Sequence, residues 1–171
     1  LDALARDFEH LLGEEPEEER LQLFIEQNPV LLHQFPSIAI HFKPPILTKF
    51  KADFAIVTPQ KELLLIEIER SSMRLLKKDG HESAALTHAS NQVHDWLHEL
   101  DQHRMAALDS MGIAADSVAK VSGVVIAGRD KGNDALQLRR LKGVDRGRIT
   151  FMTFDDLLVA IKSLANRVRK S

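Results

Sequence analysis

The sequence contains no cysteine among its 171 residues. This absence excludes disulfide frameworks and thiolate chemistry, and it agrees with a reducing cytoplasm, which is the location we predict. The sequence also lacks any apolar run near the roughly 20 residues of a membrane-spanning helix, and no charged-then-apolar leader opens it. We therefore expect no membrane partner.

The remaining composition indicates a globular protein with one core. Hydrophobic residues make up 44% of the chain, which is enough for one domain of this length. The chain starts with Leu1 rather than Met, so we expect a module cut from a longer protein. We place a helix in residues 1–15, as the end of a preceding domain or a linker, and the main domain in residues 16–171.

Charge is distributed unevenly along the chain. Residues 1–119 contain 11 Lys and Arg against 20 Asp and Glu, whereas residues 120–171 contain 12 against 5. A basic region of this kind could face phosphates while the whole protein stays near neutral. A solvated C-terminal helix rich in Arg and Lys would produce the same imbalance.

Hydrophobic periodicity predicts an α/β fold with a mixed sheet and helices on both faces. Two early helices are followed by extended segments, a long helix from Ser83 to about Leu108, and strands that alternate with helices to the end. The strongest strand signals are "KADFAIV", "ELLLIEIE", "KVSGVVIAG" and "RITFMTF". The last helix opens with "TFDD", which reads as a capping box between Thr153 and Asp156.

Three carboxylates are predicted to gather at one end of a hairpin. Glu67 and Glu69 are two residues apart in a strand, so both point to the same side. If Val57 pairs with Leu63 across the "TPQK" turn, Asp53 lies opposite Glu67. A register shift of one residue would turn Asp53 away.

Clustered carboxylates of this kind suit a hard divalent cation. Mg²⁺ prefers oxygen ligands and retains several waters, and it can stabilise charge that develops on a phosphate. The spacing by itself is also typical of solvated or salt-bridged acids at a strand end.

Six segments together resemble the Shedu anti-phage defence proteins, whose shared C-terminal module resembles the PD-(D/E)XK nucleases. They are "ERLQLFIEQNPVLL", "KADFAIV", "LLLIEIER", "ASNQVHDWL", "VVIAGR" and "ITFMTFDDLL". The resemblance runs from about Glu19 to Leu158. It implies a restriction-endonuclease-like fold, DNA cleavage that depends on Mg²⁺ or Mn²⁺, and a homo-oligomer.

The resemblance also assigns roles to individual residues. Asp53 and Glu67 match the metal-binding Asp and Glu, and Glu69 occupies the position where the signature has Lys. Glu69 could bind metal or accept a proton instead. Lys51, two residues before Asp53, could supply the missing ammonium group or simply be solvated.

Two further residues are candidates to support the site. Glu26, on an early helix, matches the region where related nucleases place another acidic group, and we predict that it binds metal. Gln92 falls where several relatives direct a Gln at the metal. The alternative for Glu26 is a solvated position at a helix end, and the alternative for Gln92 is a hydrogen bond at the edge of the core. The histidines lack the spacing of a zinc site.

The C-terminal arginines are the candidates for DNA binding, namely Arg129, Arg139, Arg140, Arg146 and Arg148. Arg129 could instead brace the sheet. The glycine-containing "AGRDKGND" lacks the spacing of a phosphate-binding P-loop.

The sequence therefore predicts a metal-dependent DNA endonuclease of anti-phage defence. The alternative is a nuclease-like domain that has lost catalysis and binds nucleic acid or assembles complexes. The substitution at position 69, where Glu69 stands in place of the Lys of the signature, keeps this alternative open.

Overall fold

A five-stranded mixed sheet with the order β1-β4-β5-β6-β7 lies at the centre of the computed structural model, which describes residues 1–170. β4 pairs antiparallel with β1 and β5, whereas β5, β6 and β7 run parallel. The strands are β1 (Ala39–Phe42), β4 (Phe54–Val57), β5 (Glu62–Ile68), β6 (Lys120–Ile126) and β7 (Ile149–Met152). A separate two-stranded sheet joins β2 (Pro45–Ile46) to β3 (Phe50–Lys51).

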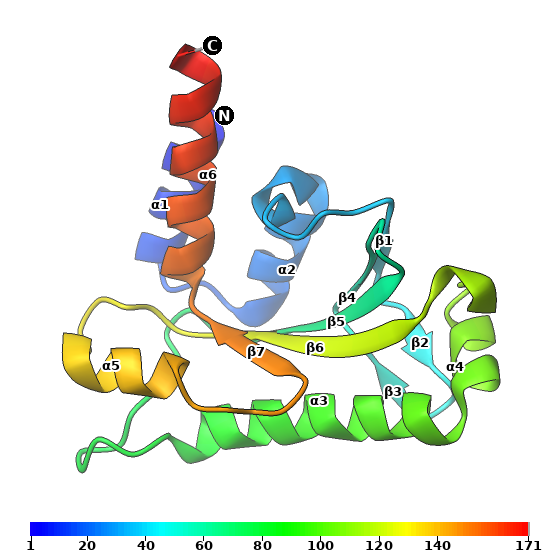
Figure 1. Ribbon diagram of the computed structural model, residues 1–171. Helices are drawn as coiled ribbons and strands as arrows, with labels where there is room; N and C mark the ends of the chain where they lie inside the picture. The colour runs from blue at the N-terminus through cyan, green and yellow to red at the C-terminus, as the bar shows by residue number, and fades with distance from the viewer. Residues whose placement is uncertain (171) are drawn as a thin grey trace.

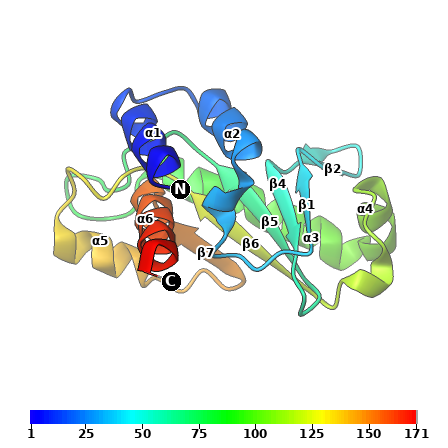
Figure 2. The same cartoon turned by 90° about the horizontal axis from the view of Figure 1, so that it is seen from above.

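Helices cover both faces of the central sheet, which confirms the predicted fold class (Figures 1 and 2). The long helix α3 lies under one face, and α1, α2 and α6 stand on the other. The helices are α1 (Asp2–Gly13), α2 (Glu18–Gln27), α3 (Ala84–Gln102), α4 (Arg104–Ser110), α5 (Ala135–Lys142) and α6 (Phe154–Lys170), with short 3-10 turns η1 (Pro29–Leu32) and η2 (Ala115–Ser117). No helix within residues 1–170 combines the length and the apolar character needed to cross a membrane.

The apolar run of β5 is explained by its two covered faces. Leu63 and Leu65 belong to the core beneath α3, whereas Ile66 and Ile68 belong to the core shared with α2 and α6. Because side chains alternate along a strand, Glu67 shares the α3 side of the sheet with Leu63 and Leu65. The strand thus carries an acidic side chain into the position of a core residue.

The hairpin of β4 and β5 has the predicted register. Val57 pairs with Leu63 and Phe54 pairs with Ile66. The same register places Asp53, which immediately precedes β4, opposite Glu67.

The prediction of one long helix over residues 83–108 is wrong in one respect, because this segment forms two helices, α3 and α4. His103, at φ −134° and ψ 44°, leaves the helical conformation between them. The change of direction lets Ala107 and Leu108 bury against the core. It also brings the Ser110 hydroxyl to the backbone N–H of Leu47, at 2.9 Å.

The first helix packs into the same core as the rest of the chain. Phe8 and Leu12 of α1 are fully buried in the cluster that contains Phe154 and Leu157 of α6. The division at residue 15 into a preceding segment and a main domain stays a prediction.

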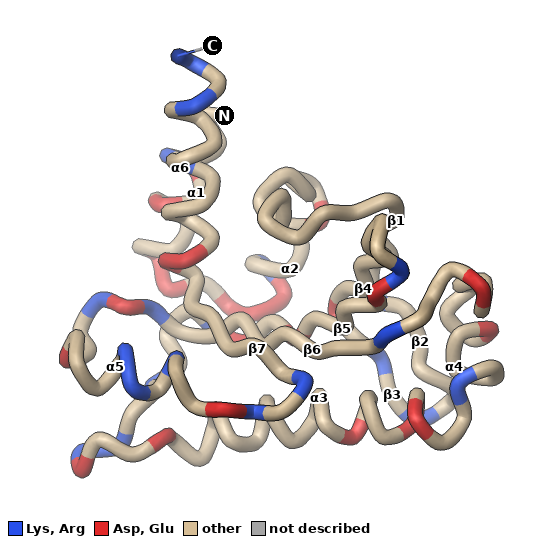
Figure 3. Tube along the Cα trace, viewed as in Figure 1, with Lys and Arg blue, Asp and Glu red and all other residues tan. Residues whose placement is uncertain are grey.

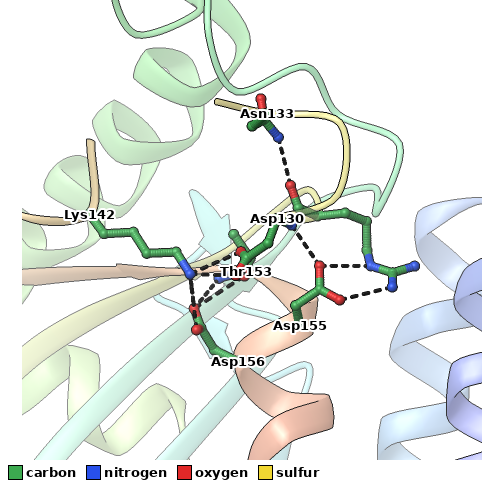
Figure 4. A network of polar contacts seen from close by, with 7 residues as sticks. Asp130, Asn133, Lys142, Thr153, Asp155 and Asp156 are labelled. Carbon is green, nitrogen blue, oxygen red and sulfur yellow. Dashed lines mark hydrogen bonds and ion pairs between the residues drawn. The ribbon is translucent and has the colours of Figure 1, made fainter. Parts of the chain in front are cut away.

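A polar network fixes the start of α6 against the β6–α5 loop and α5 (Figure 4). The Asp156 carboxylate accepts from the Thr153 backbone N–H at 2.8 Å, which is one half of the expected capping box. The Thr153 hydroxyl lies 2.6 Å from the Asp130 carboxylate instead of capping Asp156 N–H. Lys142 completes the network with ion pairs of 2.9 Å to Asp130 and Asp156.

Candidate functional site

Asp53 and Glu67 meet at the open end of the hairpin, where their carboxyl groups share a hydrogen bond. The position of Asp53 is tightly fixed. Its Oδ2 accepts from the Ile68 N–H at 2.7 Å, and its own N–H donates to Ile66 O at 3.1 Å. Its carbonyl accepts from the Lys43 N–H at 2.8 Å. The acid pair is therefore built into the sheet rather than carried on a loose loop.

Burial makes this pair hard to ionise. Glu67 is only 6% exposed. Burial, with the charges of Asp53, Glu69 and Glu18, raises the pKa of Glu67 to about 10. Burial also raises the pKa of Asp53 to about 7, against the lowering effect of the Ile68 N–H. At neutral pH the pair therefore retains a proton, which the two carboxyl groups share.

Glu69 is the third carboxylate of the cluster. It directly follows β5, is half-buried, and donates its backbone N–H to Ile126 O at 2.9 Å. Burial and the neighbouring Glu18 charge raise its pKa, while His88 on α3 and the adjacent Arg70 act to lower it. The structure thus brings together the three acids that the strand pattern predicted.

Glu18 on α2 is a fourth acid, which sequence reasoning missed. Its charge acts on Asp53, Glu67 and Glu69, and burial raises its own pKa. The buried Gln22 side chain donates to Glu18 Oε1 at 2.8 Å. Helical spacing could have identified Glu18, because it lies one turn before the buried Gln22 and so on the same face of α2.

Glu26, the acid predicted from this helix, lies farther away along α2. Eight residues separate it from Glu18, which is about 12 Å along a helix axis. Within residues 1–170, no hydrogen bond or ion pair joins Glu26 to the acidic cluster. Its metal-binding role stays a prediction that the geometry does not support.

Lys51 agrees with the solvated alternative, and its catalytic role stays a prediction. The prediction assumed one continuous strand through Asp53, but the chain bends there and Lys51 belongs to β3 in the separate small sheet. Its side chain is exposed. The lysine whose charge lowers the pKa of Asp53 is Lys43, which the folded chain brings close through its backbone bond to Asp53.

Gln92 lies on α3, the helix that covers the Glu67 side of the sheet, and it is half-buried. His88, one turn earlier, is the α3 residue whose charge acts on Glu69. A supporting role for Gln92 stays a prediction.

The donor set of the cluster fits a Mg²⁺ or Mn²⁺ ion held in part by water. No group of three or more His, Cys, Asp and Glu side chains within residues 1–170 has a geometry ready to hold a metal ion. Mg²⁺ is commonly bound by one or two carboxylates with waters and substrate phosphate completing the shell. Asp53 and Glu67 supply two such ligands, and a cation would relieve the repulsion that raises their pKa values.

Three of the five predicted DNA-binding arginines are engaged within the protein. Arg129 makes a two-point contact with Asp155, at 3.0 and 2.9 Å, which braces the sheet edge to α6. The Arg146 side chain is 6% exposed, pairs with Glu82 and lies over the Phe151 ring. Arg148 makes a two-point contact with Asp101.

Arg139 and Arg140 are the two that remain available. Both are exposed on α5, and no ion pair within residues 1–170 involves either side chain. Figure 3 shows Lys and Arg positions on α5, while Asp and Glu positions gather where α1 leads into α2. These two exposed arginines, which we call the basic patch, could each meet a phosphate, although adjacent helix positions point in different directions.

Comparison with known protein families gives a match over most of the chain. The family described as "Shedu protein SduA, C-terminal" matches residues 15–158. No curated protein matches the sequence.

Proposed function

The chain belongs to the Shedu SduA C-terminal family, which implies a part in anti-phage defence, and on this premise we propose that it is a metal-dependent DNA endonuclease. The proposed reaction is hydrolysis of DNA phosphodiester bonds. We further propose that the protein follows the PD-(D/E)XK pattern, acts in the cytoplasm and forms a homo-oligomer.

One observation carries the catalytic proposal. Asp53 and Glu67, joined by a hydrogen bond and largely buried, lie at a sheet end with Glu69 and Glu18 beside them. Like charges are not normally brought together in a poorly solvated place without a cation to balance them. Perturbed carboxylates of this kind are typical of functional sites.

Each residue has a proposed role. Asp53 and Glu67 would hold Mg²⁺ or Mn²⁺, and the Ile68 N–H would orient the Asp53 carboxylate. When bound, the metal would act as a Lewis acid for the negative charge that develops on the phosphate. Glu69, which is half-buried and has a raised pKa, is suited to accept a proton from the attacking water.

The second candidate function is a nuclease-like module without catalysis. It is favoured by Glu69 standing where the signature has Lys and by the placement of Lys51 in a different sheet. In that case the domain would bind DNA or assemble complexes. Plasmid nicking with Mg²⁺ and Mn²⁺ separates the two candidates.

Metal binding is expected to release a proton. Because the pair retains one near pH 7, calorimetric titration with Mn²⁺ should release about one proton per metal when measured in buffers of different ionisation enthalpy. Affinity should rise as pH increases from 6 to 9. Native protein should also melt at a higher temperature with metal.

Two variants serve as the comparison for this titration. Glu67→Gln should lose Mn²⁺ binding, whereas Glu19→Gln, at an exposed position next to Glu18, should keep it. Absence of Mn²⁺ binding by native protein at millimolar concentration would favour the inactive module.

The basic patch is expected to contribute to the salt dependence of DNA binding. Replacing Arg139 and Arg140 by Ala should reduce the slope of log affinity against log salt by about two phosphate contacts, with little effect on base preference. Fluorescence anisotropy with a labelled duplex measures this slope. Replacement of Arg6 and Arg167, which are exposed on α1 and α6, removes equal charge and should leave it unchanged.

A further inference from the structure

A cavity of about 430 Å³ lies between the two loops that follow β5 and β6 and the end of α1. Its walls come from residues 71–75, from Arg129 and residues 131–133, and from Leu12, Gly13 and Glu15 at the end of α1. Figures 1 and 2 both show these loops side by side. The Gly128 N–H donates to Arg70 O at 3.1 Å, which fixes one loop against the other.

The cavity adjoins the acidic cluster along the chain. Ser71, on its wall, is only two residues beyond Glu69. Both loops leave the carboxyl ends of parallel strands, which is where ligands commonly bind in α/β sheets. A ligand in the cavity would therefore lie at the same end of the sheet as Asp53 and Glu67.

The charged residues on the wall are mainly cationic. Arg74, Arg129 and Lys131 line the cavity, and Glu15 is the acid among its lining residues. Arg129 is occupied by Asp155, but Arg74 uses only Nε, in a 2.9 Å bond to Leu76 O. No ion pair within residues 1–170 involves Lys131. Two cationic groups thus have donors to offer.

A buried hydroxyl is the second sign of a ligand. Ser71 is 2% exposed, and its Oγ has no hydrogen-bond partner in the part of the chain that the structure describes. A buried polar group without a partner is costly and calls for an explanation. A phosphate oxygen next to this wall would give the hydroxyl an acceptor.

We propose that this cavity binds a backbone phosphate of the same DNA strand that is cleaved. This phosphate would neighbour the reacting phosphate at Asp53 and Glu67. The inference rests on the proposed function and adds a second phosphate site to it. Four acids near the reacting phosphate repel DNA, and Arg74 and Lys131 offset part of that repulsion where the strand would continue. The cavity residues are positioning residues, since they hold the strand and not the reacting atoms.

The test measures DNA binding without divalent metal. Duplex affinity is followed by anisotropy in EDTA over a range of KCl for native protein and for the double variant Arg74→Ala with Lys131→Ala. Raising the salt from 50 to 200 mM weakens DNA binding. Loss of two phosphate contacts should make this fold-loss of affinity about tenfold smaller in the double variant than in native protein. The matched control replaces Lys77 and Lys78, which are exposed in the same β5–α3 loop and outside the cavity.

Ser71→Ala provides an independent readout. Removing an unpartnered buried hydroxyl should leave the melting temperature equal or higher, yet it should weaken DNA binding. Inorganic phosphate and a mononucleotide are tested in parallel by thermal shift.

Equal salt slopes for native protein and the cavity variant would overturn the inference. So would a cavity that binds inorganic phosphate or a mononucleotide while the DNA slope stays unchanged, because the site would then serve a small anion. Neither result affects the proposed function. That function is judged by Mn²⁺ binding and by DNA cleavage, and by the loss of cleavage in the Asp53 and Glu67 variants.

Discussion

Asp53→Asn and Glu67→Gln are each expected to abolish DNA cleavage while leaving the protein folded. Each change removes a carboxylate that would hold the metal, and a loss of roughly 10²- to 10³-fold is the size seen when one strong electrostatic contact is removed. The amides keep the side-chain volume, and the amide oxygen introduced by Asp53→Asn could still accept from the Ile68 N–H. Plasmid nicking with Mg²⁺ or Mn²⁺ measures the loss.

The control for this prediction lies on α2. Glu19→Gln should retain native activity, because Glu19 is exposed and lies outside the cluster. Glu18→Gln should have an intermediate effect, since Glu18 acts on the acids by its charge. Normal cleavage by Asp53→Asn or Glu67→Gln would refute the assignment of the active site.

The same variants should change how stability depends on pH. Below about pH 3 both acids are protonated in the folded and unfolded states, so their shifted pKa values do not change the free energy of unfolding there. As pH rises, the unfolded chain loses these protons first, because the folded pKa values are about 7 for Asp53 and about 10 for Glu67. Native stability should therefore fall between pH 4 and 10, and Glu67→Gln should flatten that fall in metal-free melting curves.

Glu69→Lys is the second change with a large expected effect. We expect it to cripple cleavage, because it removes the proposed proton acceptor. The new ammonium group would also stand among Glu18, Asp53 and Glu67 and compete with the metal for their carboxylates. Initial rates of plasmid nicking measure the effect, and circular dichroism checks that the variant is folded.

The opposite outcome has a definite meaning. If native protein does not cleave and Glu69→Lys does, the domain lost catalysis at this one position. If both proteins bind DNA and neither cuts it with any divalent metal, the nuclease proposal fails and the binding module stands. Glu69→Gln is the matched control, because it removes the charge without adding a cation.

The acidic pair shows how much local sequence can determine. The Leu and Ile run of β5 identifies a strand covered on both faces, and the short turn before it fixes the hairpin register. Period-two alternation then places Asp53 opposite Glu67, as the structure confirms. These interactions are close in sequence, so the pattern predicts the two strands, while the structure decides between the expected register and one shifted by a residue.

Other parts of the site depend on contacts between distant segments. Lys51 lies only two residues before Asp53, but the chain bends at Asp53 and Lys51 pairs in the separate small sheet. The long helix ends at His103 because burial of Ala107 and Leu108 requires a new direction. A residue's local propensity does not encode such turns, since distant packing decides them.

The sequence by itself determined the fold class, the family and the meeting of Asp53, Glu67 and Glu69. Only the tertiary structure decided that Glu18 and Lys43 act on this cluster. It also decided which arginines are engaged by acids, namely Arg129, Arg146 and Arg148. Arg139 and Arg140 stay exposed. Residue type and spacing predict which face of a strand a side chain occupies. Whether an arginine meets solvent or a carboxylate depends on packing between segments far apart in the chain, and therefore on the whole fold.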